Sequence, residues 1–429
     1  MSEAAAATPQ QGPSPAYRWL VLLLISLAMF GNYYVYDSIA PIADMLKADL
    51  GFTDENIGSL YSVYSIAAVL VLLIGGVMID RYGTVKSTIL FGGLCTIAAV
   101  INALTDDFVV MAVARFILGL GAEPLIVAVT TALAKWFKGR ELGFAFGINL
   151  TIARLGSFAA DWSPTWAEWA YNSWQMPLVI SAVIGALCVL SPLGYGAMES
   201  HANRRWGLGK AGETDKFKFS DIFKFSPSFW FVVLLCVTFY SAIFPFRTFA
   251  IKFFIEAWDM TRANAGQANS VMIFASMIAT PLFGLLVDKV GKRSHMMMLG
   301  AFLLMPVYVL LAYKLLPFGV PIAMLGIAFS LVPAVMWPSV AYIVNERRLG
   351  TAYAVMTLIQ QIGVAAMNWL IGKVNDVQGA GVANPEGYAM GMWIFSVLGF
   401  LALAFAIALN VVERGPRGHG LDKAIVNEA

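Results

Sequence analysis

Apolar runs of about 20 residues recur along almost the whole chain of 429 residues, and this repetition constrains the fold most. A helix rises 1.5 Å per residue, so about 20 residues cross the ~30 Å hydrocarbon core of a bilayer. Hydrophobic residues make up 59% of the sequence and charged residues only 13%, against roughly a quarter in soluble domains. The sequence therefore predicts an all-α membrane protein.

About twelve transmembrane helices are expected, six in each half of the chain. The first six are expected at residues 18–40, 57–79, 87–104, 108–135, 142–164 and 176–197. The second six are expected at residues 229–251, 265–287, 296–316, 320–344, 349–373 and 390–412.

Basic residues set the expected orientation. Most of the 28 Lys and Arg residues fall on one side of the alternating spans, in loops at 81–86, 135–140, 204–224, 289–293, 347–348 and 414–423. Loops rich in Lys and Arg stay in the cytoplasm. Both termini are therefore predicted to be cytoplasmic.

Polar segments predict the domain limits. Residues 1–17 are expected to be a disordered cytoplasmic tail, 18–198 an N-terminal six-helix bundle, and 199–224 a cytoplasmic linker. Residues 225–413 are expected to form the C-terminal six-helix bundle, followed by a cytoplasmic tail at 414–429.

Two side chains of opposite charge, Glu123 and Arg154, lie in the middle of apolar spans. A charge at the bilayer centre costs roughly 2.5–3.5 kcal/mol on insertion scales, so such residues usually face a cavity. We expect the pair to bind a ligand that carries both charges, with its ammonium on Glu123 and its carboxylate on Arg154. The alternative is a salt bridge that only joins two helices.

The two halves of the chain repeat a short motif. The segment 76–83 of the first half returns as 284–291 in the second half, each with an acid, a base and a glycine at a cytoplasmic turn. The glycines suit a tight turn, and the charges can latch one helix end to its neighbour in one access state. We assign a conformational role to Asp80, Arg81, Gly83, Asp288, Lys289 and Gly291.

These motifs resemble the signature loops of the major facilitator superfamily, and the run from Arg115 to Gly121 resembles its second motif. The resemblance implies the major facilitator fold, with a binding site between two bundles that move by alternating access. It also suggests a gating role for Arg115.

A closer similarity is to the branch of that superfamily that contains lysosomal dipeptide uniporters. It covers residues 115–156 and further segments at 36–37, 244–246, 283–289, 337–338, 349–353 and 359–360. The resemblance implies dipeptide transport, with Glu123 and Arg154 at the positions that bind the amino and carboxyl ends of the peptide.

Aromatic and polar residues elsewhere in the spans are candidates for the walls of this site. The alternative for each Tyr or Trp is an anchor at the membrane interface. Tyr61 and Tyr64 are three residues apart, which places them on one face of their helix. The candidates are Tyr36, Tyr61, Tyr64, Tyr240, Asn269, Trp337, Gln360 and Gln361.

Three further charges lie within the spans. Asp37 and Arg115 lie at comparable depths, and we expect them to pair; the alternative for Asp37 is a proton carrier. Arg247 follows Pro245 and departs from the branch named above. It is a candidate for a second carboxylate clamp or for an outer gate.

The sequence also argues against other functions. All three histidines lie in predicted cytoplasmic loops, so no imidazole relay crosses the membrane, which favours uniport over proton coupling. No phosphate-binding loop, metal-ligand cluster or nucleic-acid surface is apparent, so we expect neither an enzyme nor a cofactor. One alternative to dipeptide uniport is a transporter of organic anions, using Arg115, Arg154 and Arg247, or of another small solute, with or without proton coupling. Another is a receptor or scaffold that kept the transporter shape.

The expected partners are a dipeptide and the lipid bilayer, and the expected state is a monomer. The chain carries no acidic dileucine-type signal near its start, so the cytoplasmic membrane of a bacterium is the expected location, with the lysosomal membrane as the alternative.

Overall fold

The computed structural model describes residues 13–137, 141–207, 222–416 and 418–423. Within these ranges twelve helical segments are long and apolar enough to cross a membrane, and only one isolated bridge, between Gly381 and Asn384, has strand geometry. The predicted all-α membrane fold is confirmed.

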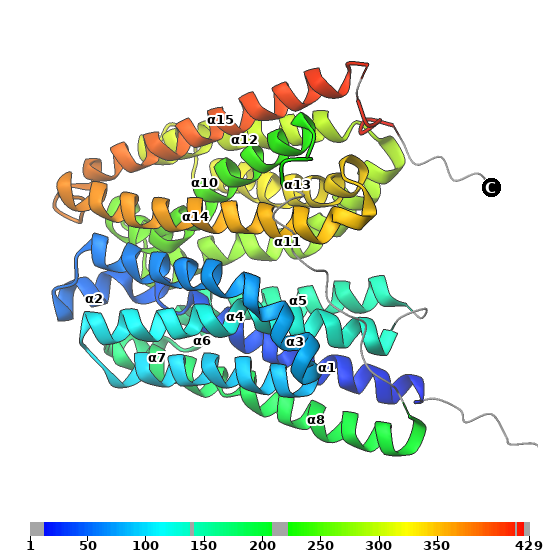
Figure 1. Cartoon of the computed structure of the whole chain (residues 1–429). Coiled ribbons are helices and arrows are strands. Elements are labelled where there is room, and N and C mark those ends of the chain that lie inside the picture. The colour runs from blue at the N-terminus through cyan, green and yellow to red at the C-terminus, as the bar shows by residue number, and fades with distance from the viewer. Residues whose placement is uncertain (1–12, 138–140, 208–221, 417, 424–429) are drawn as a thin grey trace, which may run out of the picture.

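The first half of the chain forms one bundle, which we call the first bundle and which is blue to green in the lower part of Figure 1. Its elements are α1 (Pro15–Asp37), η1 (Ala40–Ile42), α2 (Ala43–Leu50), α3 (Asp54–Leu104), α4 (Phe108–Phe137), α5 (Leu142–Asp161), α6 (Ser163–Trp166), η2 (Glu168–Asn172), α7 (Gln175–Gly185) and α8 (Leu187–Trp206).

The second half forms the second bundle, which lies above the first in Figure 1. Its elements are α10 (Pro227–Trp258), α11 (Arg262–Val290), α12 (Arg293–Ala312), α13 (Gly319–Ile343), η3 (Glu346–Arg348), α14 (Leu349–Val377), η4 (Pro385–Tyr388) and α15 (Ala389–Glu413).

Hydroxyl side chains begin several of these helices. Ser14, Thr53, Ser226 and Thr261 are N-caps, and each accepts a hydrogen bond from a backbone N–H three residues later. Such a cap satisfies one of the amide groups that a helix start leaves without a partner. The polar boundary residues between apolar runs therefore fix where the helices start.

Glycines form both signature turns. Gly83 interrupts α3 with φ of 81° and ψ of 168°, which divides it into arms at 54–82 and 84–104. Gly291 ends α11 with φ of 71°. L side chains rarely adopt these positive φ values, so the glycine of each repeat supports a turn that other residues would strain.

Three predicted limits need comment. Helix α8 continues to Trp206, so the first part of the expected linker, 199–206, is helical. Residues 208–221 of that linker, 1–12 of the first tail and 424–429 of the last tail lie outside the described residues. Within the last tail Leu421 is buried, and the Asp422 carboxylate accepts a hydrogen bond from the Ser294 amide at 2.9 Å.

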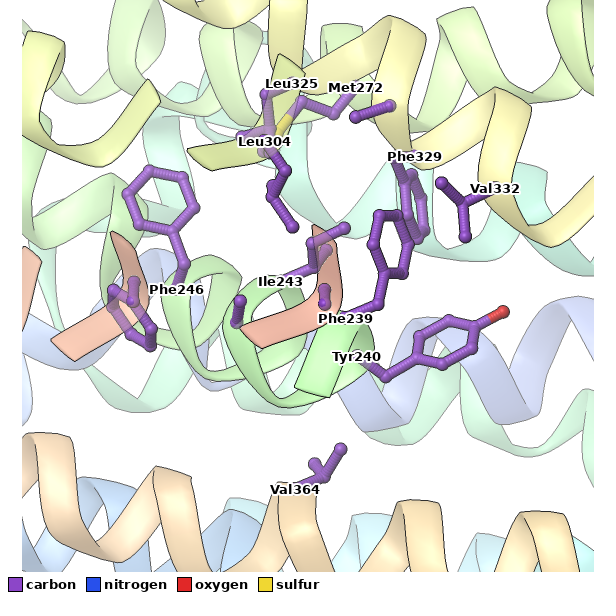
Figure 2. Close-up of a cluster of buried hydrophobic side chains, with 14 of the residues drawn as sticks. Phe239, Tyr240, Ile243, Phe246, Met272, Leu304, Leu325, Phe329, Val332 and Val364 are labelled. Carbon is purple, nitrogen blue, oxygen red and sulfur yellow. The ribbon is translucent and has the colours of Figure 1, made fainter. Parts of the chain in front are cut away.

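The buried apolar residues form two cores, one within the first bundle and one that fills the second bundle and extends to first-bundle residues such as Ile39 and Leu60, and glycines lie where helices approach closely. A Cβ at Gly92 would lie 1.8 Å from the Cys188 carbonyl oxygen, and a Cβ at Gly156 would lie 2.2 Å from that of Phe30. Close helix approach at small residues is how membrane helices gain packing energy without a strong hydrophobic effect between them. The second core surrounds α10, whose Phe246 and Ile243 contact residues of α12 and α13 (Figure 2).

The bundles meet at the end of the molecule opposite the basic loops. The Ser62 hydroxyl of α3 donates to the Ala365 carbonyl oxygen of α14 at 2.6 Å, and a Cβ at Gly58 would lie 2.1 Å from the Asn368 carbonyl oxygen. Arg262 donates through both terminal nitrogens to the Asp44 carboxylate at 2.6 Å each. The bundles are thus in direct contact at the ends opposite the basic loops, which the sequence predicts to be non-cytoplasmic and which we call the non-cytoplasmic ends.

Candidate substrate-binding site

A cavity of about 620 Å³ lies between the two bundles. Helices α1, α3, α4 and α5 line it from the first bundle, and α10, α11, α13 and α14 line it from the second. Its volume is in the range of small-molecule sites, which is roughly 300–1,000 Å³. Ten of the twelve sequence candidates are in its lining, namely Tyr36, Asp37, Tyr64, Glu123, Arg154, Tyr240, Arg247, Trp337, Gln360 and Gln361.

Glu123 lies on α4 immediately before Pro124 and is half-buried. One of its carboxylate oxygens, Oε1, accepts a hydrogen bond from the Tyr64 hydroxyl at 3.3 Å and another from the Gln361 amide at 3.0 Å. Tyr64 belongs to the first bundle and Gln361 to the second. The carboxylate therefore contacts both sides of the cavity.

Arg154 lies on α5 and reaches α11 of the other bundle. Its Nη1 donates to the Ser276 carbonyl oxygen at 3.0 Å, to the Ser276 hydroxyl at 3.1 Å and to the Thr280 hydroxyl at 3.3 Å. The guanidinium thus contacts only neutral oxygens in these bonds. No ion pair joins Arg154 to Glu123 among the described residues, so the alternative of a purely structural bridge between them is not found.

Arg115 does not pair with Asp37 as expected. It is fully buried on α4, where it donates to the carbonyl oxygens of Val35 at 3.2 Å and Tyr36 at 2.9 Å. Its guanidinium carbon also lies 4.7 Å from the Tyr61 ring centroid. The cation is therefore satisfied by the end of α1 and by aromatic faces.

Tyr61 lies behind the cavity lining, although Tyr64 is part of it. The Tyr61 ring packs edge-on against Tyr36 at 5.4 Å between centroids and receives Arg115 on its face. Three residues along a helix turn by about 300°, so the two tyrosines diverge by roughly 60°. One of them therefore faces the cavity and the other faces the core.

Asp37 pairs instead with Arg247. The Arg247 Nη2 lies 3.5 Å from the Asp37 carboxylate and 2.8 Å from the Asp161 carboxylate, and all three side chains are buried. Asp37 and Asp161 belong to the first bundle and Arg247 to the second. This group, which we call the Arg247 cluster, ties the bundles together where the cavity ends.

A second cluster of charges lies further toward the non-cytoplasmic end. Lys252 of α10 is 0% exposed and contacts the Asp54 carboxylate of α3 at 3.1 Å and the Glu256 carboxylate at 2.9 Å. It also donates to the Tyr388 hydroxyl at 2.6 Å, and that hydroxyl donates to Glu256. We call these four residues the Lys252 cluster.

Asp376 reinforces that contact from the end of α14. Its carboxylate accepts hydrogen bonds from the amides of Asp54 at 2.9 Å and Glu55 at 2.7 Å, the first residues of α3. A carboxylate at a helix N-terminus satisfies free amides and the positive end of the helix dipole. One bundle thus caps a helix of the other.

The second bundle gives the cavity an aromatic wall. The Trp337 indole donates to the Tyr240 hydroxyl at 2.9 Å, and the Tyr240 ring stacks on Phe244 at 5.3 Å between centroids. Figure 2 shows the Tyr240 hydroxyl directed away from the apolar core around Phe246 and Leu304. This wall offers apolar surface with few fixed polar groups.

Asn269 is the other candidate outside the lining. It is fully buried on α11, and neither of its amide atoms has a hydrogen-bond partner in the structure. Gln360 does line the cavity, and its Oε1 faces the Cys236 thiol at 3.6 Å rather than Glu123.

The sequence interpretation missed further lining residues. Several lie one helical turn from a residue that was chosen: Tyr33 before Tyr36, Ser157 after Arg154, and Thr357 before Gln360. That spacing was a usable signal. The missed lining residues are Asn32, Tyr33, Ile126, Leu150, Ser157, Phe244, Ile273, Thr280, Phe329, Pro333, Ala334, Pro338, Thr357 and Val364.

The two signature turns, at Gly83 and Gly291, lie at the end of the molecule opposite the Arg247 and Lys252 clusters. Asp288 pairs with Arg293 at 2.9 Å, and Arg293 also lies over the Tyr342 ring at 4.3 Å from its centroid. This links the end of α11 to α12 and α13. The conformational role of these turns stays a prediction. No group of three or more metal-ligating residues is found in the part of the chain that the structure describes.

Two helical bundles around a cavity lined by aromatic and charged side chains define the protein as a membrane transporter for small solutes. The chain belongs to the Major Facilitator Superfamily, whose family model matches residues 25–256 and 247–424. This is a family of transporters and not of enzymes.

Relatives and solved structures agree with this assignment. The chain is 34% identical to the lysosomal dipeptide transporter MFSD1 of Homo sapiens over 422 residues, 94% of this chain and 88% of that protein. It is also 34% identical to the Danio rerio protein of the same name over 381 residues, 85% and 82% of the two chains.

The fold is similar to two solved transporters of low sequence identity. A bacterial homolog of the human lysosomal transporter Spinster, in an inward-facing and occupied conformation, matches with a TM-score of 0.76 at 15% identity over 93% of this chain and 98% of that chain. The nucleoside transporter NupG matches with a TM-score of 0.68 at 17% identity over 92% and 99%.

Proposed function

We propose that the protein moves dipeptides across the membrane by alternating access, as a uniporter. One observation supports this most: Glu123 and Arg154 share one cavity without pairing with each other. Each charge is therefore available to a ligand. A dipeptide carries an ammonium and a carboxylate roughly 7 Å apart when extended, which suits two separate charges.

The aromatic wall suits the variable part of a dipeptide. Tyr240, Phe244 and Trp337 offer apolar contact, and the neutral amides of Gln360 and Gln361 add adaptable hydrogen bonding. Such a site would fix the two termini and accept many side chains. The similarity to the lysosomal dipeptide transporters over most of the chain supports the same substrate class.

Organic-anion transport is the second candidate. Part of the chain, 32% of it, is 28% identical to a probable sulfoacetate transporter of Cupriavidus necator, and three arginines lie in the spans. The contacts favour organic-anion transport less than dipeptide transport. Arg247 is already paired with Asp37 and Asp161, and aromatic rings cover Arg115, so neither arginine is open to an anion. Arg154 alone would bind the anion, and Glu123 would repel it.

Uptake by liposomes that contain the purified protein tests the proposal. We expect labelled dipeptide to enter down its own gradient without an imposed proton gradient. Unlabelled dipeptides should compete, and dipeptides acetylated at the amine or amidated at the carboxylate should compete at least tenfold less well, because each loses a charge-assisted bond. Uptake of sulfonates or sugar acids without uptake of dipeptide would contradict it.

We further propose that the protein works as a monomer in the cytoplasmic membrane of a bacterium, with the lysosomal membrane as the alternative location. The bacterial location is supported by the sequence near residue 1, which shows no acidic dileucine-type signal for sorting to lysosomes. The lysosomal location is supported by the similarity to lysosomal transporters.

A further inference from the structure

The two charges of the cavity are held in the same way. Glu123 accepts from the Gln361 amide at 3.0 Å, and Arg154 donates to Ser276 and to the Thr280 hydroxyl at 3.0–3.3 Å. Both charges belong to the first bundle, and these three partners belong to the second. Each contact therefore crosses the cavity from one bundle to the other.

The partners resemble the ends of a dipeptide in their hydrogen-bonding chemistry. The Gln361 amide donates N–H to a carboxylate, as a peptide ammonium would. The Ser276 carbonyl oxygen and the Thr280 hydroxyl accept from a guanidinium, as a peptide carboxylate would. The second bundle thus offers neutral substitutes for both terminal groups of the ligand.

A uniporter has a step that needs such substitutes. After it releases its substrate, the carrier must return to the other side with no substrate bound. During that return the closed cavity keeps Glu123 and Arg154 away from bulk water, and a buried charged group without a partner is strongly unfavourable.

We propose that Gln361, Ser276 and Thr280 hold Glu123 and Arg154 while the substrate-free carrier reorients; this inference rests on the proposed dipeptide uniport. Neutral partners suit the task because a peptide ammonium or carboxylate adds a charge–charge attraction that Gln361, Ser276 and Thr280 lack. An incoming dipeptide therefore displaces them, and its release restores them. The contacts would also draw the two bundles together.

Neighbouring residues provide matched controls. Gln360 precedes Gln361 on α14 and lines the same cavity, but its amide oxygen faces the Cys236 thiol. Thr357 lies in the lining, as Thr280 does, and no hydrogen bond to Arg154 is recorded for it. Substitution of these two residues changes the cavity without removing the contacts in question.

Two assays in liposomes separate the steps. Net efflux of labelled dipeptide requires the substrate-free return, whereas exchange against excess unlabelled dipeptide on the other side lets the carrier return loaded. We expect Gln361→Ala and Thr280→Val to lower the ratio of net efflux to exchange about tenfold, the size expected for the loss of one hydrogen bond to a charged group, since Tyr64 and Ser276 still contact the two charges. Gln360 and Thr357 line the substrate cavity, so we expect Gln360→Ala and Thr357→Val to change net efflux and exchange by the same factor and thus to keep the wild-type ratio.

The outcomes discriminate between the two proposals. An unchanged ratio in Gln361→Ala and Thr280→Val, or an equal drop in both control variants, would overturn the inference while leaving dipeptide transport intact. Using the ratio removes differences in folding and insertion, because both assays count the same active protein. Wild-type vesicles that exchange no dipeptide would overturn the proposed function, and the inference with it.

Discussion

Two groups of charged side chains within the spans contact the opposite bundle, and their charges are satisfied in opposite ways. Glu123 and Arg154 are kept apart and contact neutral groups of the second bundle. Arg247 and Lys252 contact carboxylates of the first bundle directly, at 2.8 Å for Asp161 and 3.1 Å for Asp54. The first group lines the cavity, and the second closes the end of the cavity that lies opposite the basic loops.

The difference indicates two tasks for intramembrane charge. A charge held by weak neutral partners can exchange them for a ligand. A charge held by an opposite charge in a site without water is costly to separate, because each partner left alone is a buried ion. We therefore propose that Glu123 and Arg154 recognise the substrate, and that the Arg247 and Lys252 clusters close one access path.

Loss of the Lys252 charge should give the largest effect. Lys252→Met leaves Glu256 without its cation and leaves Asp54 with Lys47 alone, at 3.3 Å, and removal of one partner of a buried pair costs about 3–5 kcal/mol. We expect this cost to favour opening of the non-cytoplasmic end by roughly 10²–10³-fold. A cysteine at Ala365, which is 8% exposed at the α3–α14 contact, reports opening through its labelling rate.

Lys373→Met is the control, because Lys373 is exposed on α14 and lies over the Trp369 ring at 4.9 Å. It should label as slowly as the parent protein, and the three native cysteines are buried. Equal labelling of the Lys252 and Lys373 variants would show that the cluster does not hold the interface closed.

A methyl group added at the contact between α3 and α14 should also favour opening of the non-cytoplasmic end, by a smaller factor than loss of the Lys252 charge. A Cβ at Gly58 would lie 2.1 Å from the Asn368 carbonyl oxygen of the other bundle, so Gly58→Ala can be accommodated only by separation of α3 and α14. Overpacking of this kind costs about 1–3 kcal/mol, or roughly tenfold in the opening equilibrium.

Gly93→Ala in the second arm of α3 is the matched change, since nothing lies within 4 Å of a Cβ there. The same labelling assay should detect no change for it. If Gly58→Ala melts at a lower temperature but labels as slowly as the parent protein, the contact serves packing alone.

Arg247→Lys should have the smallest effect. One nitrogen of Arg247, Nη2, contacts both carboxylates, so a lysine ammonium keeps the charge between Asp37 and Asp161 and loses only the reach and orientation of the guanidinium. We expect this to cost about 1 kcal/mol, or several-fold in opening. The preference for a free over an amidated dipeptide should be retained. Loss of that preference would instead make Arg247 a carboxylate clamp, the second role open from the sequence.

The spans and the repeat could be predicted from the sequence because each depends on local pattern. A run of about 20 apolar residues is stable in a bilayer only as an α-helix. The repeat is equally visible, because Gly83 and Gly291 each follow such a run together with an acidic and a basic residue. Helix ends were less predictable. The last apolar run of the first bundle was expected to end at residue 197, but α8 continues to Trp206, because a polar segment can stay helical beyond the apolar run.

Residues of the cavity could be predicted from the sequence only where burying them in the membrane is energetically costly. Glu123 and Arg154 stand out because a charge in mid-span is expensive, whereas Ser276 and Thr280 are ordinary polar residues in a helix. Asp161 and Lys252 lie near helix ends, where charges are common, so their burial became visible only when the bundles were brought together. The failed Asp37–Arg115 pairing has the same cause, since depth alone does not specify which helices are neighbours.

The central claim is that Glu123 binds the amine and Arg154 the carboxylate of one dipeptide. Affinities of a dipeptide, its N-acetyl form and its C-terminal amide, measured on wild type, Glu123→Gln and Arg154→Ala, test it directly. We expect each block to weaken binding to wild type roughly 10–100-fold, acetylation to have no further effect in Glu123→Gln, and amidation to have none in Arg154→Ala. If both variants respond to both blocks as wild type does, the two charges do not bind the termini.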